Sequence, residues 1–553
     1  MKTIKAIILF FLSALIVVPA TAQYSWKNLP TAKLPTFKKD TFNIKAYGAK
    51  ADGTTLNTKS INNAINDCSK KGGGVVLIPE GLWLTGPIVL KNNVNLHVKS
   101  SAILQYSSDF NQYPLVVGTY EGRRSARNQS PLSGENLVNV AVTGKGIIDG
   151  NGDVWRMVGK DRLTEKQWQN KVASGGLVSA DGKIWYPSEK TKKAHEEKLN
   201  GVFENGKTLK DFENIKDYLR PNLVVFTNCK KVLLEGVTFQ NSPAWNLHPL
   251  ECEDLTIKNV MVKNPEYAQN GDGVDVESCK NVLIEGCIFD VGDDGICIKS
   301  GKDEEGRKRG KPTENVVIRN CTVYKGHGGF VIGSEMSGGA RNIFVYNCSF
   351  IGTDKGLRFK TARGRGGMVE KIYCKDIFMK DIVDEAIYFD MYYFTKPPKP
   401  GEKVEVPVAS ETTPQFQNFE ISNIVCDGAT KGIFIRGLPE MAIKNISISN
   451  VVLNTDKGVE IIEAAGVQLR HVTLLNKNTE PVIYIENSTG IAIDGLKYND
   501  VSTLLLNIYG ERSKGISIKH TDTVKAKSVT RFENGADDAA ITITKWKPMP
   551  QRH

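Results

Sequence analysis

A short pattern of alternating apolar and polar positions recurs between residues 230 and 500. Each copy alternates apolar residues with other residues, and a small or polar residue stands before its last apolar positions. These central residues are Gly236, Asn259, Gly286, Asn320, Asn347, Asp376, Asn423, Asn450, His471 and Gly495. Most intervals are 21 to 29 residues, and longer ones mark intruding loops. Alternation with a period of two predicts β-strands, and a repeat of this length indicates a solenoid.

A second strand accompanies these units, and each copy of it begins at a glycine or an alanine. The copies cover residues 273–276, 295–298, 329–332, 356–359, 386–389, 432–435 and 458–461. Each repeat therefore holds at least two strands, and stacking pairs each strand with neighbours about 4.8 Å away. We expect a single-stranded right-handed parallel β-helix. The amphipathic spacing from Asn57 to Cys68 predicts a short helix that caps its N-terminal end.

An N-terminal segment and one long interruption complete the predicted organisation. Residues 1–22 have the charged start, apolar run and small residues of a secretory signal. The apolar run is shorter than the roughly 20 residues that a membrane span needs. We expect residues 23–553 to form one β-helix domain, exported to the periplasm or secreted, with no membrane anchor and monomeric. Residues 153–219 break the repeat and indicate a surface excursion.

Composition changes this picture little. The chain carries 72 basic and 61 acidic residues, and removal of Lys2 and Lys5 with the signal reduces its formal charge from +11 to +9. Such an excess suits nucleic acid, an anionic surface or a polyanionic carbohydrate. Because the basic residues are scattered and not interleaved with aromatic residues, we expect no nucleic-acid partner. The ten cysteines follow the repeat, so we expect most to be buried, and their pairing stays open.

Three aspartates and a histidine stand at the starts of the second strands. Asp272 precedes one strand, Asp293 and Asp294 precede the next, and His327 precedes the one after. Successive turns lie a few ångströms apart, so we expect the carboxylates to share one patch. Close carboxylates cannot all ionise easily, and a protonated acid beside an ionised base can split a glycosidic bond. Turn capping or calcium binding is the alternative role for such acids.

Four motifs in order carry a resemblance to a known family. They are Asn270-Gly271-Asp272, Gly292-Asp293-Asp294, Gly326-His327-Gly328 and Arg358-Phe359-Lys360. With the run from Gly144 to Gly152, they make the chain resemble the polygalacturonase family, glycoside hydrolase family 28, in its bacterial exo-acting type. The resemblance implies hydrolysis of α-1,4-galacturonic-acid linkages in pectin by single-displacement inversion. It also implies an acidic polysaccharide or oligosaccharide, such as galacturonan, as partner, and no metal or cofactor.

The resemblance also implies a role for each catalytic candidate. Asp293 is the implied general acid, while Asp272 and Asp294 position and deprotonate the attacking water. His327 is implied to control the protonation or the orientation of the acid. For a single histidine, a purely structural role is the alternative.

Six further residues are candidates for substrate binding: Arg358, Lys360, Asn270, Lys299, His248 and Trp245. The resemblance gives Arg358 and Lys360 the substrate carboxylate, since a guanidinium and an ammonium suit a planar anion. Lys299 occupies the outward position of Lys360 two turns earlier. Trp245 and His248 precede Asp272 by about one turn and are placed for a sugar platform and a polar contact. A solvated lysine and a tryptophan packed in the core are the alternatives.

Two positions depart from the family pattern. Gly271 replaces the usual threonine, and Phe359 replaces the usual isoleucine. We expect Phe359 to point inward and to change packing. Gly271 lies beside an implied catalytic acid and looks like a variant of exo-acting and rhamnogalacturonan-directed relatives, so the substrate stays open. Rungs about 4.8 Å apart also fall below the roughly 6.5 to 9.5 Å between the carboxylates of inverting enzymes, so inversion rests on the resemblance.

Three loops bear on the mode of attack, and other functions remain open. The excursion at 153–219 and the loop near 397–400 are placed to close one end of the groove, which favours removal of single residues from a chain end. The charged loop at 301–311 is either placed to meet further substrate carboxylates or is a solvated charge run. The alternatives are a rhamnogalacturonan-directed galacturonidase or hydrolase, a pectate lyase that needs calcium, and a non-catalytic glycan-binding β-helix.

Overall fold

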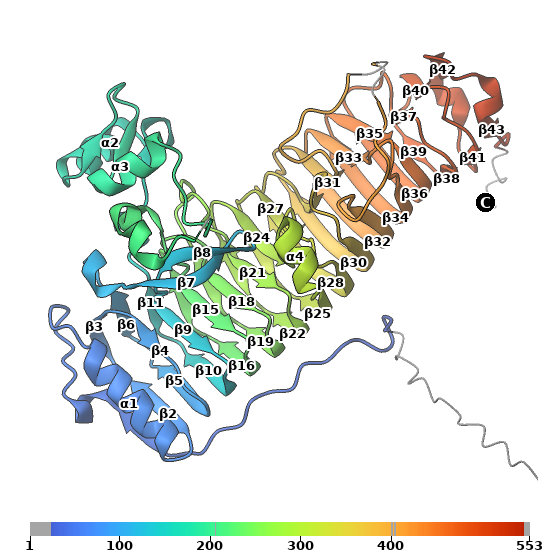
Figure 1. Cartoon of the computed structure of the whole chain (residues 1–553). Helices are drawn as coiled ribbons and strands as arrows, with labels where there is room; N and C mark the ends of the chain where they lie inside the picture. Colours follow the sequence, from blue (N-terminus) through green and yellow to red (C-terminus); the bar gives the residue numbers. More distant parts are fainter. Residues whose placement is uncertain (1–23, 205, 400–401, 403–404, 547–553) are drawn as a thin grey trace, which may run out of the picture.

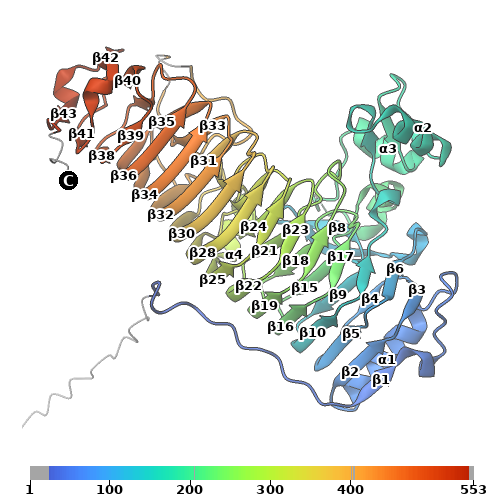
Figure 2. The ribbon, with the colours of Figure 1, turned by 180° about the vertical axis from the view of Figure 1, so that it is seen from behind.

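The chain winds into a long solenoid of parallel strands. A computed structural model describes residues 24–204, 206–399, 402 and 405–546, and the predicted signal segment 1–22 lies outside them. The rungs stack from α1 (Thr58–Lys70) at one end to β43 (Ile541–Ile543) at the other (Figure 1), and the view from behind shows the same continuous stack (Figure 2). The predicted right-handed parallel β-helix is confirmed.

Two long sheets make up the rungs of the described residues. One has 14 strands: β4 (Ile88–Val89), β9 (Leu132–Glu135), β15 (Val224–Thr227), β18 (Leu247–Leu250), β21 (Val274–Glu277), β24 (Asp294–Lys299), β27 (Gly328–Ile332), β29 (Leu357–Lys360), β31 (Glu385–Asp390), β33 (Lys431–Arg436), β35 (Lys457–Ile462), β37 (Ile483–Glu486), β40 (Ser502–Tyr509) and β42 (Ala526–Glu533).

The other has 24 strands in the same described residues. These are β1 (Thr41–Asn43), β2 (Gly74–Ile78), β3 (Gly81–Thr85), β5 (Val94–Val98), β6 (Ala102–Tyr106), β10 (Val138–Gly144), β11 (Ile147–Asp149), β16 (Lys230–Glu235), β17 (Thr238–Gln240), β19 (Glu253–Lys258), β20 (Met261–Lys263), β22 (Lys280–Glu285), β23 (Ile288–Asp290), β25 (Thr313–Arg319), β26 (Thr322–Tyr324), β28 (Ala340–Ile351), β30 (Met368–Lys380), β32 (Gln415–Asp427), β34 (Ile443–Thr455), β36 (Ala464–Asn476), β38 (Ala492–Asp494), β39 (Lys497–Tyr498), β41 (Ile516–Lys519) and β43.

The remaining elements lie outside these sheets. The strands are β7 (Leu115–Tyr120), β8 (Arg123–Asn128), β12 (Val158–Gly159), β13 (Leu177–Val178) and β14 (Ile184–Tyr186). The α-helices are α2 (Glu165–Ala173), α3 (Glu189–Glu196) and α4 (Asp303–Arg309). The 3-10 helices are η1 (Ile44–Tyr47), η2 (Phe110–Gln112), η3 (Gly152–Val154), η4 (Lys160–Arg162), η5 (Leu209–Tyr218), η6 (Thr523–Lys525) and η7 (Asp538–Ala540).

A complete turn contains three strands, as in the succession of β22, β23 and β24. The first two belong to the 24-stranded sheet, and the third belongs to the 14-stranded sheet. From β28 to β36 the first two merge into single bent strands, such as the 13-residue strand β30, and they separate again at β38 and β39. The sequence predicts at least two strands per turn, and the third is the short segment after each repeated polar residue.

The repeated polar residues mark bends in the backbone. All ten positions named by the repeat have φ between 51° and 79°. This left-handed region suits glycine, and it is adopted more readily by asparagine and aspartate than by other L-residues. The side chains also form ladders between rungs, since Asn347 Nδ2 donates to Asn320 Oδ1 at 2.7 Å and Asn423 Nδ2 donates to Asp376 Oδ1 at 2.9 Å.

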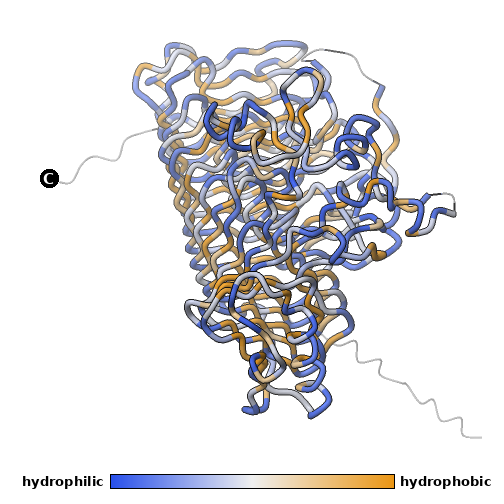
Figure 3. The backbone as a smooth tube through the Cα atoms, turned by 90° about the vertical axis from the view of Figure 1, so that its left-hand side faces the viewer, coloured by the Kyte–Doolittle hydropathy of each residue, from blue (hydrophilic) through white to orange (hydrophobic). Residues whose placement is uncertain are grey.

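Apolar side chains from both sheets fill the interior of the solenoid. Hydrophobic and hydrophilic residues alternate along the coils (Figure 3). Phe359 is buried and packs against Phe389 and Phe419, as its predicted inward direction requires. All ten cysteines are buried and free, so the interpretation of them as small apolar residues is confirmed.

Two N-terminal segments cover the solenoid. The predicted capping helix is α1, which buries Ile61, Ala64, Ile65 and Cys68 against the first rungs. Residues 24–40 run along the outside of the stack (Figures 1 and 2), and Trp26 packs edge-on against Phe344, a residue of β28.

The excursion at 153–219 holds α2, α3 and η5. No helix of the described residues is long and apolar enough to span a bilayer.

Candidate active site

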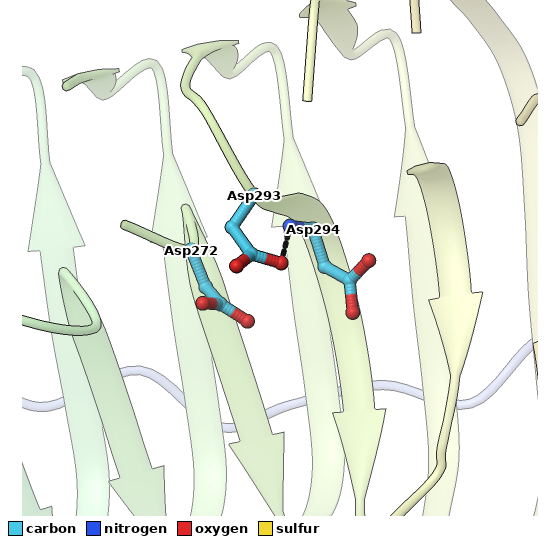
Figure 4. Close-up of side chains that lie close together, drawn as sticks. All are labelled: Asp272, Asp293 and Asp294. Atoms are coloured by element: carbon cyan, nitrogen blue, oxygen red, sulfur yellow. Dashed lines mark hydrogen bonds between the residues drawn. The ribbon is translucent and has the colours of Figure 1, made fainter. Parts of the chain in front are cut away.

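Three aspartates meet at the start of two neighbouring strands of the 14-stranded sheet. Val274 and Ile296 are paired in register, which puts Asp272 and Asp294, two residues before each, at equivalent positions. Asp293 precedes Asp294 directly. One carboxylate oxygen of each aspartate lies within 4.8 Å of the other two, and Figure 4 shows the three side chains side by side. The structure thus brings the predicted carboxylates into one patch.

Consecutive strand residues normally face opposite ways, so a local bend brings Asp293 and Asp294 together. Asp293 Oδ1 accepts a hydrogen bond from the backbone N–H of Asp294 at 2.9 Å. The flanking glycines are required by packing, since a side chain at Gly292 would overlap the carbonyl oxygen of Glu266. At Gly295 a side chain would overlap that of Val323. The glycines therefore let the chain turn without displacing neighbouring rungs.

Asp294 is held in its ionised form by two cations. Arg358 Nη1 donates to its Oδ1 at 2.9 Å, and Lys360 Nζ donates to its Oδ2 at 2.7 Å. Arg358 and Lys360 are two residues apart on β29, so their side chains lie on the same face of the sheet. Burial alone would raise the pKa of Asp294, but Lys360 and Arg358 hold that pKa well below its usual range.

Asp272 has the opposite environment. It is buried, and its Oδ1 has no hydrogen-bond partner among the described residues. Burial raises the pKa of Asp272 well above its usual range, and the neighbouring Asp275 and Asp293 raise it further. Burial likewise raises the pKa of Asp275 to about 8, although Lys299 opposes that rise. Of the three aspartates, Asp272 therefore keeps a proton most readily in the free protein, whereas the resemblance implies Asp293 as the acid.

Asp293 is the most accessible of the three aspartates, and it is paired with His327. Nδ1 of His327 lies 3.1 Å from Asp293 Oδ1, and its Nε2 lies 3.9 Å from Asp354. The hydrogen bond to Asp293 raises the pKa of His327, while partial burial opposes the rise. Among the described residues, both polar contacts of the Asp293 carboxylate go to Oδ1, which leaves Oδ2 to face a ligand.

Two aromatic residues that the sequence does not single out border this patch. The ring of Tyr393 lies 4.9 Å from Lys360 Nζ and 5.7 Å from the Arg358 guanidinium. Phe394 follows with 84% of its surface exposed, and its ring centroid is 3.9 Å from that of Tyr393. Both belong to the irregular segment between β31 and β32, where no repeat fixes the direction of a side chain.

Three residues predicted to contact the substrate are buried in the free protein, and their direct contact with a ligand stays a prediction. Trp245 is 2% exposed, His248 is 1% exposed and Lys299 is 3% exposed. Tyr120 stacks on Trp245 with ring centroids 5.9 Å apart and covers its ring in the free protein. All three side chains do leave the core on the outer face, but other parts of the chain cover them.

Their polar atoms join a buried network beside the aspartates. His248 Nε2 lies 2.9 Å from Glu277, and Arg309 Nη1 donates to Glu277 at 2.6 Å. Lys299 Nζ donates to Glu335 at 3.0 Å and lies 3.5 Å from Asp275. His248 and Lys299 therefore stabilise the floor beneath the patch.

The first motif has a packing role in this chain. Asn270 is half-buried with φ of 51°, and its Oδ1 accepts a hydrogen bond from Arg220 Nη2 at 2.9 Å. A Cβ atom at Gly271 would lie 2.8 Å from both Cβ and the carbonyl oxygen of Ala268. A threonine does not fit there without displacing Ala268. The contact with Ala268 thus accounts for Gly271 without reference to the substrate.

One end of the outer face is covered by the hairpin of β7 and β8. Lys302 Nζ donates to Glu121 at 3.1 Å, and Arg123 forms an ion pair with Asp303 at the start of α4. The backbone N–H of Arg124 donates to Glu305 at 2.8 Å. These contacts fasten the tip of the hairpin to α4, beside the strand that carries Asp294.

The prediction that the excursion at 153–219 closes one end of the groove therefore needs correction. The excursion packs against the hairpin, because Phe212 and Ile215 of η5 contact Leu115 and Ala126. The hairpin itself, which the sequence pattern does not identify, covers the sheet. Pro397, Pro398 and Lys399 are described as irregular chain, and Pro400 lies outside the described residues.

The charged loop at 301–311 is tied to the protein's own carboxylates. Arg309 binds Glu277, Lys311 binds Glu251, and Lys308 binds Glu304. Arg309 is 14% exposed and holds α4 onto the sheet, which disfavours a contact with substrate. Lys311 stays 56% exposed beside Glu251, so its contact with substrate stays a prediction.

The three aspartates also lie close enough together to share a cation. Among the described residues, no other group of acidic, histidine or cysteine side chains does so. Arg358 and Lys360 already neutralise Asp294 from two sides. Two fixed cations at this distance repel a divalent ion, so the donor set favours a binder of anionic ligands.

Comparison with known proteins identifies relatives across most of the chain. The family model described as Glycosyl hydrolases family 28 matches residues 159–413, and one described as Rhamnogalacturonase A/epimerase, pectate lyase-like, matches residues 41–175. A probable polygalacturonase of Vitis vinifera is 30% identical over 72% of this chain and 71% of its own. An exo-poly-alpha-D-galacturonosidase of Dickeya chrysanthemi is 27% identical over 76% and 69%. The crystal structure of a hyperthermoactive exopolygalacturonase from Thermotoga maritima matches with a TM-score of 0.64 and 32% identity, covering 81% of this chain and 94% of that one.

Proposed function

The chain belongs to family 28 of the glycosyl hydrolases, and we propose that it hydrolyses α-1,4-galacturonic-acid linkages of pectin from a chain end. The observation that carries this proposal is the meeting of Asp272, Asp293 and Asp294 beside Arg358 and Lys360. The three aspartates can act on a glycosidic bond, and Arg358 and Lys360 can bind the carboxylate of the sugar. The names of the relatives support galacturonan as the substrate.

Asp293 is the proposed general acid. It is the aspartate that a ligand can reach, and Oδ1 is held by two hydrogen bonds while Oδ2 can turn to the leaving oxygen. In the productive form Asp293 carries its proton on Oδ2 and gives it to the leaving oxygen as the bond to the anomeric carbon breaks, while His327 holds Oδ1 and fixes the direction of the carboxyl group. Asp293 then takes a proton from solvent, to which its side chain is partly exposed.

Asp294 and Asp272 are the proposed holders of the attacking water. When a substrate carboxylate binds Arg358 and Lys360, it competes with Asp294 for both cations. The pKa of Asp294 then rises towards its usual range, and the carboxylate becomes a better base for the proton of water. Asp272, whose pKa is raised by burial, can hold that water by donating a hydrogen bond from its protonated form.

Inversion is part of the proposal. The separation of the carboxylate oxygens, within 4.8 Å, is nearer to the value of retaining enzymes than to that of inverting ones. A retaining reaction, however, needs one carboxylate free to attack the sugar. Asp272 is buried and favours its proton, so it does not suit a nucleophile. For Asp294, attack by water follows the family resemblance.

The chain-end mode is supported by the covered rung beside Asp272. Tyr120 of the hairpin lies over Trp245, which takes the position of Asp272 one rung earlier. A polymer bound at the aspartates therefore cannot continue towards β15 and extends towards β31 instead. A site closed on one side favours release of single sugar residues.

The proposal is tested by incubating the mature protein with polygalacturonic acid, while reducing ends and ultraviolet absorbance are followed together. Hydrolysis yields reducing ends without absorbance, and the chelator EDTA leaves the rate unchanged. Asp293→Asn abolishes the signal. Rising absorbance, or a loss of rate with EDTA that calcium restores, would establish a lyase and overturn the proposal.

A rhamnogalacturonan-directed galacturonidase is the second candidate. The match of residues 41–175 to the family described as Rhamnogalacturonase A/epimerase favours it. The same assay with rhamnogalacturonan fragments separates the two, because the preferred substrate is the one with the higher kcat/KM.

A polymer substrate also suits an enzyme that is exported and monomeric. Cell fractionation tests the export, and light scattering tests the oligomeric state.

A further inference from the structure

The outer rows that hold Arg358 and Lys360 continue along the 14-stranded sheet towards the C-terminus. In register, Arg358 is followed by Tyr388, Phe434, Glu460 and Tyr484, and Lys360 is followed by Asp390, Arg436, Ile462, Glu486 and Tyr509. Tyr484 lies four rungs beyond Arg358 on the same face, which is about 19 Å at about 4.8 Å per rung. The rows thus connect the catalytic patch with a distant part of the sheet.

A surface cavity of about 460 Å³ opens on these C-terminal rungs. Its walls come from β33, β35, β37, β40 and β42 and from the turns beside them. It contains none of the residues of the catalytic patch. Tyr484, Tyr509, Glu460 and Glu486 line it from consecutive rungs.

Two tyrosine rings form the apolar part of this cavity. The ring centroids of Tyr484 and Tyr509 lie 6.2 Å apart, and the angle between the two rings is 40°. Both are half-buried on the outer face, while Ile483 and Ile485 of the same strand fill the core. The hydroxyl of Tyr484 donates to Glu486 Oε2 at 2.8 Å, which fixes the first ring. Aromatic rings held in this way offer a flat surface to the C–H face of a sugar.

The charge of the cavity is opposite to that of the catalytic patch. Its carboxylates outnumber its ammonium groups, since Glu460, Glu480, Glu486 and Glu533 face Lys431 and Lys457. Lys431 Nζ is bound to Glu460 at 2.6 Å and Arg531 is paired with Glu480 at 2.8 Å, so Glu486 and Glu533 remain against Lys457. An excess of carboxylates repels a galacturonate, but it offers acceptors for the hydroxyl groups of an uncharged sugar.

We propose that this cavity is a second carbohydrate site, which binds a neutral oligosaccharide through Tyr484 and Tyr509, with Glu486 and Glu460 as hydrogen-bond acceptors. A divalent cation is a poorer occupant, because among the described residues the three catalytic aspartates alone lie close enough to share one. If the proposed function holds, the site receives an uncharged branch of a polymer whose acidic chain enters the catalytic patch. Binding of the neutral sugar itself does not depend on that function.

The test is saturation-transfer NMR on the mature full-length protein, with β-1,4-galactotetraose and α-1,5-arabinotetraose as neutral probes and trigalacturonate as the acidic one. At least one neutral probe should receive saturation from the wild type. Loss of an aromatic contact of about 0.5–1.5 kcal/mol corresponds to roughly two- to tenfold weaker binding. Tyr484→Ala and Tyr509→Ala should each show this loss, and Glu486→Gln, which keeps the shape of the side chain, should also weaken binding.

The matched control is Tyr324→Ala, because Tyr324 is a 39% exposed tyrosine of the 24-stranded sheet. It should bind like the wild type, and all variants should keep the wild-type melting temperature within a few degrees and hydrolyse polygalacturonic acid equally fast. No saturation of either neutral probe overturns the inference. So does binding that survives in Tyr484→Ala and Glu486→Gln, or a response of trigalacturonate to these variants. The assay requires no turnover, so its failure is distinguishable from failure of the proposed hydrolysis.

Discussion

Trp245 and Asp272 occupy equivalent positions on neighbouring rungs, because Leu247 and Val274, two residues after each, are paired in register. Trp245 is covered by Tyr120 from the hairpin of β7 and β8, with the two rings 27° from parallel. The outer face is therefore closed one rung before Asp272, and it continues in the other direction through Arg358. This asymmetry is the physical basis for the proposed attack at a chain end.

Shortening the hairpin should convert chain-end attack into internal cleavage. Gly118 and Ser125 are paired, so an Asn-Gly turn can replace residues 119–124 between them. The change removes Tyr120 and the ion pairs of Glu121 and Arg123 with the region of α4. Products separated by size should change from free galacturonic acid to a ladder of oligomers.

The control for this variant is an Asn-Gly turn in place of residues 180–182. A side chain at Gly182 would meet nothing within 4 Å, so the shortened turn disturbs little. It should release galacturonic acid as the wild type does. If the shortened hairpin still yields monomer alone, the hairpin does not set the mode of attack.

Arg358→Gln should weaken binding of substrates that carry a free carboxylate. Loss of a hydrogen bond to a charged group costs about 1.5–3 kcal/mol, which is roughly 10- to 150-fold in kcat/KM. Because Arg358 also binds Asp294, part of the loss should appear in kcat. The penalty should be clearly smaller on methyl-esterified trigalacturonate, whose carboxyl groups are neutral.

Arg341→Gln is the matched control, since Arg341 pairs with Glu314 on the 24-stranded sheet. Its kinetics should equal those of the wild type on both substrates. Equal losses for Arg358→Gln on the acid and on the ester would mean that Arg358 acts through Asp294 and does not bind the substrate carboxylate.

The bends and the aspartate patch are predictable from sequence because local chemistry and repeat length determine them. Asn320 and Asn347 mark turns, since asparagine tolerates the left-handed backbone that a rung needs. Once the repeat is known, the distance from Asp272 to Asp294 follows from one turn of the solenoid. Beyond the pairing of neighbouring rungs, no long-range contact enters either inference.

The burial of Trp245, His248 and Lys299 is not predictable in the same way. Strand alternation gives the direction of a side chain relative to the core, but not what lies above it. The hairpin at 115–128 and α4 leave the repeat, so no period indicates where they fold. Tyr393 is missed for the same reason, because its segment has no register of its own.

Asp293→Asn should lower the pKa of His327. The hydrogen bond to Asp293 is the largest cause of the raised pKa, so in the wild type His327 stays protonated to a higher pH than a free imidazole, whose pKa is about 6.5. Proton NMR of the imidazole signals against pH measures the change, and the other six histidines serve as internal references. An unchanged midpoint for His327 would contradict the proposed pairing with the acid.

Trp26→Ala should destabilise the solenoid without changing its activity. Trp26 lies edge-on to Phe344, Tyr346 and Tyr373 at 5.3 to 6.3 Å, and Lys375 Nζ lies 4.2 Å from its ring. Losing these contacts should cost about 1–3 kcal/mol of unfolding free energy. Thermal unfolding measures the loss. Leu34→Ala, at a 57% exposed position of the same segment, should unfold like the wild type, and equal melting of both variants would show that residues 24–40 do not stabilise the stack.

The most direct test of the catalytic account is a time-resolved proton NMR experiment on trigalacturonate with wild type and Asp293→Asn. The account predicts that β-galacturonic acid appears first, because water attacks an α-linkage with inversion, and that the α-anomer follows only by mutarotation. Asp293→Asn should show neither product on the same timescale. Initial α-anomer would mean retention, an unsaturated product would mean elimination, and undiminished turnover in Asp293→Asn would remove Asp293 as the acid.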